Sequence, residues 1–99
     1  MNNIPPSILD SAKVLAFAVV DETVIYENRK TLYVDGELLG AVPKLAICQN
    51  YNEEEVMLFH CDDEWTVLGV SSHGCFLEAA QAAERSYKGL LQKWIRQCT

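Results

Sequence analysis

The stretch EVMLFHCDDEWTVLGV, residues 55–70, decides the fold of this chain. Its first part, 55–61, and its last part, 64–70, both have the composition of β-strands, and Asp62-Asp63 makes a tight connection between them. Such a short connection joins antiparallel strands, because a parallel crossover needs about a dozen residues or more.

The first strand of this hairpin is apolar on both of its faces. Alternate side chains of a strand point to opposite faces. One face carries Val56, Leu58 and His60, and the other carries Met57, Phe59 and Cys61. We therefore expect a central strand with something packed on each side, or a strand that uses one face for self-association.

Three further regions have strand character. They are the apolar run 14–20, the run 44–49 that follows Pro43, and the pair 31–34 and 37–39 on either side of Asp35-Gly36. Asp-Gly between two strand-like runs predicts a type I′ hairpin, because both central residues need a positive φ.

Two shorter segments are less regular. Residues 23–26 form a β-branched run that either continues the first strand after a bend or begins another. Residues 7–12, after two prolines, are expected to form one helical turn that leads inward.

From Phe76 onward the apolar residues recur every three or four positions. They are Phe76, Ala80, Ala83, Tyr87, Leu90 and Trp94. This spacing is typical of an amphipathic helix. Cys75 and Glu78 have the spacing of a capping box with a thiol at the N-cap. Gly89 either costs the helix about 1 kcal/mol or ends it in the left-handed conformation, with 90–97 a second short helical segment.

These elements predict an α+β fold, in which an antiparallel meander sheet of about five strands packs against a C-terminal amphipathic helix. The chain has 99 residues, 49% of them hydrophobic, and we expect a single domain over residues 1–99. No linker, repeat or low-complexity tract divides the sequence.

The net charge of −6, from 14 acidic and 8 basic side chains, argues against nucleic acid as the main partner. Phosphate binding needs clustered Lys and Arg. No apolar run approaches the ~18 residues that cross a bilayer, and residues 1–6 lack the pattern of a secretory signal. We therefore expect a cytoplasmic protein without membrane association, whose Cys48, Cys61, Cys75 and Cys98 are reduced thiols.

Cys75 and His73 are weak catalytic candidates. A helix N-terminus favours the thiolate, and the histidine lies two residues away. A Cys–His nucleophile also needs a base within hydrogen-bonding reach and an oxyanion site, and the sequence shows neither. His60 and Cys61 are further soft ligands, but they face opposite sides of a regular strand, so we predict no metal site. No cofactor motif is present either.

The charge is unevenly distributed along the chain. Residues 53–64 contain no Lys or Arg and six acids, namely Glu53, Glu54, Glu55, Asp62, Asp63 and Glu64. Residues 85–99 contain no acidic side chain and four bases, namely Arg85, Lys88, Lys93 and Arg96. One interpretation is solubilising hairpin ends and charges that suit the helix dipole. The other is an acidic edge that binds a basic partner or the basic helix of a second copy.

Residues 45–48 (LAIC), 58–62 (LFHCD), 65–69 (WTVLG) and 79–94 resemble a small uncharacterised bacterial single-domain family. That resemblance implies no established activity. The strand–Gly-Cys–helix segment around Cys75 is more weakly similar to HicB-type antitoxin domains. The chain lacks their Pro-x-x-Pro-Gly-Cys approach and any DNA-binding extension.

Two functions from different classes remain. The first is a non-enzymatic acidic protein–protein interaction module, immunity-like or antitoxin-like, which needs no catalytic residues. The second is a small thiol-dependent enzyme or redox protein that uses Cys75. Self-association as a homodimer, through an exposed sheet face or edge strand, is compatible with both. We expect the first, with the six acids of residues 53–64 as the partner-binding residues.

Overall fold

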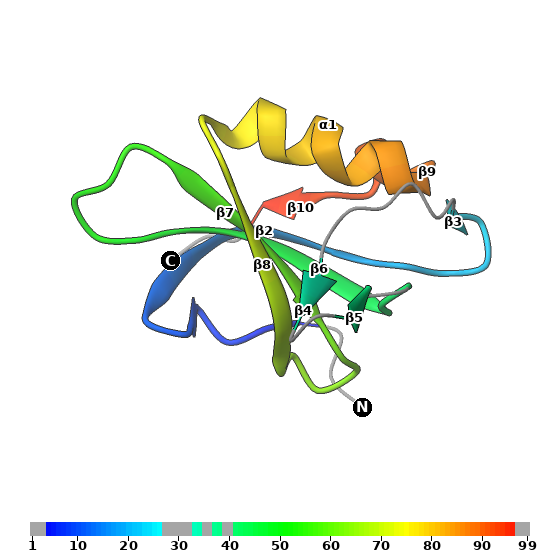
Figure 1. Cartoon of the computed structure of the whole chain (residues 1–99), viewed down its shortest axis with the longest axis horizontal. Helices are drawn as coiled ribbons and strands as arrows, with labels where there is room; N and C mark the ends of the chain where they lie inside the picture. Colours follow the sequence, from blue (N-terminus) through cyan, green and yellow to red (C-terminus); the bar gives the residue numbers. More distant parts are fainter. Residues whose placement is uncertain (1–3, 27–32, 35–36, 39–40, 97–99) are drawn as a thin grey trace.

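The computed structural model describes residues 4–26, 33–34, 37–38 and 41–96. Its main sheet is antiparallel, with the strands in the order β1-β2-β6-β7-β8, and α1 covers one face of it (Figure 1). The bounds are β1 Ile8–Leu9, β2 Ala12–Val19, β6 Lys44–Gln49, β7 Val56–Cys61, β8 Val67–His73 and α1 Phe76–Ser86. The predicted α+β fold, an antiparallel sheet of about five strands packed against one helix, is confirmed, and the sheet is curled.

The strand β7 is central, as its two apolar faces predict. On the face toward α1, Val56 and Leu58 join a buried cluster that includes Ala79, Ala80 and Ala83 of the helix. On the other face, Phe59 and Cys61 join a second buried cluster. No described helix covers this second face. Residues of β1, β2 and β6, together with Trp65, complete this second cluster instead.

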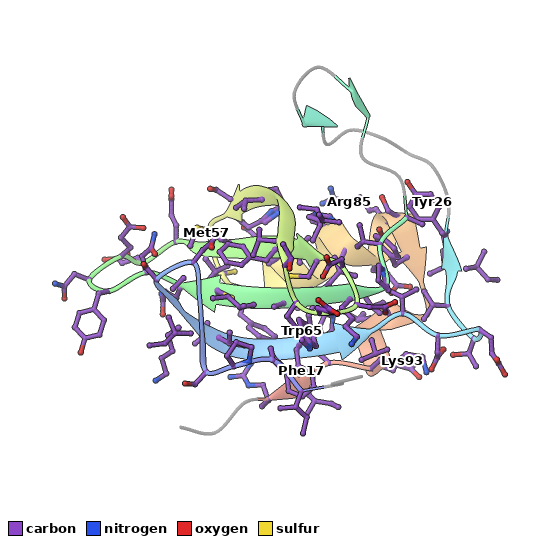
Figure 2. The ribbon with its side chains drawn as sticks, turned by 90° about the horizontal axis from the view of Figure 1, so that it is seen from below. Phe17, Tyr26, Met57, Trp65, Arg85 and Lys93 are labelled. Carbon is purple, nitrogen blue, oxygen red and sulfur yellow. The ribbon has the colours of Figure 1, made fainter. Side chains whose placement is uncertain are left out.

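The sheet encloses the second cluster because it curls. Register shifts occur between Val14 and Ala16 of β2 and between His60 and Cys61 of β7, and such irregularities increase bend and twist. Phe17 of β2 packs edge-to-face on Trp65, with ring centroids 5.9 Å apart. Figure 2 shows these two rings side by side on the side of the sheet away from α1.

The helix is shorter than the apolar spacing predicts. It ends at Ser86, and Tyr87–Lys88 form β9, which pairs with β3, Ile25–Tyr26. Gly89 adopts φ +96°, so its predicted left-handed conformation is confirmed, but it does not end the helix, because β9 separates it from Ser86. The carboxylate of Glu84 accepts the N–H groups of Gly89 and Leu91 at 3.0 and 2.8 Å, which holds the chain reversal.

The predicted second helical segment is only partly correct. Leu90–Gln92 form a single 3₁₀ turn, but Ile95–Arg96 form β10, which pairs with β2. The edge of β2 supplies hydrogen-bonding partners for this strand, and the guanidinium of Arg96 lies 4.3 Å from the ring centroid of Phe76. Tyr87 and Leu90 are buried in the helix-side cluster as predicted, although neither lies in α1.

The predicted helical turn at residues 7–12 is wrong, because β1 and β2 form a hairpin there. Its two turn residues, Asp10 and Ser11, have φ values of 48° and 68°, which suit a two-residue primed turn. The predicted hairpin around residues 35–36 is present as β4, Tyr33–Val34, paired with β5, Glu37–Leu38. Its turn residues, Asp35 and Gly36, lie outside the described residues.

Candidate partner-binding surface

The turn between β7 and β8 is held by Asp62. Its Oδ1 accepts the backbone N–H groups of Glu64 at 2.8 Å and Thr66 at 2.9 Å, and its carbonyl accepts the N–H of Trp65 at 3.1 Å. Trp65 has φ 66, an uncommon conformation for an aromatic residue, and its side chain is 4% exposed. The predicted strand 64–70 therefore begins later, at Val67, because Trp65 belongs to the turn.

The buried side chain of Lys44 also holds the β7–β8 turn in place. This side chain is 1% exposed, and its Nζ donates a hydrogen bond to the backbone carbonyl of Asp63 at 2.6 Å. The same Nζ lies 5.3 Å from the ring centroid of Trp65, within cation–π range. With the backbone held in this way, the side chains of Asp63 and Glu64 stay exposed.

Sequence reasoning missed the Lys44–Trp65 contact. A lysine at the start of an apolar strand is normally read as the solvent-facing end of that strand. No pattern in the sequence indicates this contact, because it depends on the strand register, which places Lys44 opposite Cys61, the last residue before the turn.

The loop between β6 and β7 carries the other acidic residues. Its turn is closed by the N–H of Glu53, which donates to the Asn50 carbonyl at 3.3 Å, and by the Asn50 amide, which donates to Glu53 Oε1 at 3.2 Å. The Gln49 amide donates to the Glu54 carbonyl at 3.2 Å. Glu53, Glu54 and Glu55 are all exposed, and Tyr51 beside them is 90% exposed.

The structure places the two groups of acids at opposite ends of β7. Glu53–Glu55 precede the strand and Asp62–Glu64 follow it. The nearest members of the two groups, Glu55 and Asp62, are seven residues apart, which at a rise of about 3.3 Å per residue is roughly 23 Å. They therefore form two acidic sites at the two ends of β7 rather than a single patch, and a partner that touches both must span that distance.

The C-terminal bases do not form one basic helix. Only Arg85 lies in α1; Lys88 lies in β9 and Arg96 in β10. Lys93 pairs with Asp21, with Nζ 3.2 Å from Oδ2, at the rim of a groove of about 480 Å³. The groove is lined by Ile4, Phe17, Val19, Asp21, Lys93 and Ile95. Figure 2 shows Lys93 beyond Phe17, toward the far end of β2.

Cys75 lies at the N-cap of α1 and is exposed, but its side chain makes no capping hydrogen bond. Glu78 reaches back to the N–H of Gly74 at 3.1 Å, one residue before the N-cap. His73 Nε2 lies 2.9 Å from Ser71 Oγ. Burial lowers the pKa of His73, Arg85 lowers it further, and Glu78 opposes them. No hydrogen bond joins Cys75 to His73 in the described part of the chain.

The remaining soft ligands are separated by the pleat of the sheet. Cys61 lies in the second cluster, and His60, one residue earlier in β7, points to the opposite face. Burial, with a smaller effect from His73, lowers the pKa of His60 to about 4. Burial raises the pKa values of Cys48 and Cys61 to about 12. Within the described residues, no three His, Cys, Asp or Glu side chains converge as metal ligands.

Comparisons with protein-family models, with curated proteins and with solved structures each find no match to this chain. No helix in residues 4–96, outside the undescribed gaps, is long and apolar enough to cross a membrane.

Proposed function

We propose that this protein is a non-enzymatic acidic protein–protein interaction module, of the immunity or antitoxin kind, that binds a basic partner. The observation that carries the proposal is that both turns of the β6–β7–β8 meander expose carboxylates on a backbone held by internal contacts. The acids concerned are Glu53, Glu54, Glu55, Asp63 and Glu64, with Asp62 shaping the second turn.

Pre-ordered acidic turns suit binding to a basic partner for two reasons. Charges of one sign steer an oppositely charged partner and raise its association rate. A loop that is already ordered loses less conformational entropy when it binds. The contacts of Asp62, Lys44 and Asn50 supply that order at the two turns.

The proposed compartment is the cytoplasm. Cys48 and Cys61 are buried free thiols in the two central strands, and Cys75 is a free thiol on the surface. Such thiols suit a reducing environment.

The test is affinity capture from the source cells with the double variant Asp63→Asn/Glu64→Gln. Its matched control is Asp10→Asn/Glu22→Gln, which removes the same charge from exposed acids outside both turns. We expect a basic protein to be retained by the wild type and the control and to be lost from the first variant. Equal retention by all three proteins would contradict the proposal.

The exposure of Cys75 at the start of α1 supports a second candidate, a thiol-dependent enzyme or redox protein. A thiol reagent at pH 6 decides this, with the Cys75→Ser variant identifying the signal from this residue. Labelling faster than free cysteine favours the second candidate. Labelling at the rate of free cysteine removes it.

A further inference from the structure

The strand β8 is an edge of the main sheet. It pairs with β7 on one side, and no described residue continues the ladder on its other side. The β4–β5 hairpin lies beside β8, but its described residues pair only with each other. Figure 1 shows β8 crossing the front of the sheet. Its outer backbone groups are therefore a template for another strand.

This edge lacks the usual protection against strand addition. The seven residues of β8, VLGVSSH, include no Lys, Arg, Asp, Glu or Pro. The register shift lies at the start of the strand and leaves five consecutive pairs, from His60↔Gly69 to Val56↔His73, in regular register. Leu68 and Val70 are 39% and 40% exposed. Natural edges usually carry a charge, a proline or a strong distortion.

Carboxylates stand at both ends of this uncharged edge. Asp63 and Glu64 lie in the turn that leads into β8. At the other end, His73 pairs with Val56, which Glu55 directly precedes, and Glu78 binds the N–H of Gly74. Arg85 is the basic group at this end, and its charge contributes to the lowered pKa of His73.

This charge pattern selects between the possible occupants of the edge. If two copies paired antiparallel through their β8 strands, the start of one β8, near Glu64, would lie beside the end of the other β8, near Glu55. The like charges of these acids would then repel each other. A strand with a basic residue near each end and β-branched residues between them meets attraction at both ends.

We propose that β8 binds an extended basic segment of the partner, which adds to the sheet as one further strand. The inference rests on the proposed function and names the partner's binding element. Seven residues of β8 span roughly 23 Å, so a segment of similar length reaches both acidic turns. Main-chain hydrogen bonds supply the affinity, and the two terminal bases supply the selectivity.

A synthetic peptide of seven residues tests this, with lysine at both ends and valine alternating with threonine between them. One control peptide has glutamate in place of both lysines, and the other keeps the lysines but has proline at its centre. The readouts are the dissociation constant and the hydrogen exchange of the β8 amides. Sedimentation of the free protein reports its oligomeric state.

We expect the lysine peptide to slow exchange at alternate residues of β8, because every second N–H of an edge strand points outward. Binding should weaken roughly tenfold with proline at the centre, and also roughly tenfold between 50 and 300 mM salt. The glutamate peptide should not protect β8.

Three results overturn the inference. If the proline peptide binds as tightly as the lysine peptide and hydrogen exchange of the β8 amides is not slowed, the peptides bind through charge alone. That result overturns strand addition but agrees with the proposed acidic interaction module. Equal protection by the glutamate peptide refutes the basic occupant. If exchange is already slow at alternate β8 amides in the free protein, and sedimentation shows a dimer, a second copy of the chain occupies the edge.

Discussion

The pH dependence of stability is set in part by His60, whose pKa in the folded chain is about 4 against an ordinary value of 6.5. Burial between Leu45 and Gly69 on the neighbouring strands favours the neutral ring. A pKa lowered by folding contributes stability that is present above pH 6.5 and is lost as the pH falls from 6.5 to 4.

The size of this loss follows from the gap between the two values. Each pKa unit corresponds to about 1.4 kcal/mol, so the gap amounts to about 3 kcal/mol below pH 4, of which about 2 kcal/mol is lost by pH 5. A domain of this size is stable by about 5–15 kcal/mol, so the loss is measurable.

Urea unfolding at pH 7, 6 and 5, followed by tryptophan fluorescence, measures the effect in the wild type and in His60→Gln. Carboxylates titrate alike in both proteins, so the difference between the curves belongs to His60. In His73→Gln the loss should be slightly smaller, because the repulsion from His73 is gone. Parallel curves for wild type and His60→Gln, or an NMR titration midpoint of His60 near 6.5, would refute the reasoning.

Four further predictions concern the core and the β7–β8 turn. Tyr87→Phe leaves the buried N–H of Val42 without the hydroxyl that accepts it at 3.0 Å, and should cost about 1–3 kcal/mol in urea unfolding; a loss below about 0.3 kcal/mol would contradict this. Leu90→Ala, at a fully buried position outside the helix, should cost about 2–5 kcal/mol by the same assay, whereas a surface position loses far less. Asp62→Ala should lower the melting temperature more than Asp62→Asn, since the amide keeps one acceptor oxygen for the turn; equal melting temperatures would argue against that role. Cys48→Val should make stability less sensitive to pH above 9, because a thiol pKa raised to about 12 contributes stability that is lost between pH 9 and 12; unchanged alkaline sensitivity would show that Cys48 ionises without cost.

Elements with a strong local pattern were predicted well from the sequence. The run 44–49 is β6 with the same bounds, and the run 55–61 differs from β7 by one residue. Both strands are hydrophobic on two faces because both faces of the sheet are buried. The left-handed Gly89 was also an explicit alternative, since glycine alone takes that conformation without steric cost.

The errors fall where a distant segment overrides a local preference. The apolar spacing from Phe76 to Trp94 continues past the end of α1, because its later residues contact the same core from a strand and a 3₁₀ turn. The spacing of apolar residues predicts which side chains are buried, but it does not predict whether the backbone there is a helix, a strand or a turn. Trp65 was placed in a strand because the carboxylate of Asp62, which holds it in a turn, leaves no periodic signal.

The candidate site shows the same division. The six acids were identified from the sequence composition alone. Because charged side chains favour water, the exposure of five of them could be predicted without the tertiary structure. Asp62 is the exception, since its carboxylate accepts backbone hydrogen bonds within the β7–β8 turn. That they form two sites at the ends of β7, flanking an unpaired edge, depends on the strand register.

The sequence by itself determined the α+β class, the central position of β7 and the acidic character of the two turns, because alternation, burial and charge are local properties of the residues. Only the tertiary structure decided that the chain after Ser86 leaves the helix to pair with β3 and β2, that Lys44 is buried beneath Trp65, and that β8 is an edge. These features depend on hydrogen-bonding partners far away in the chain, and isolated segments of two or three residues have no stable conformation of their own.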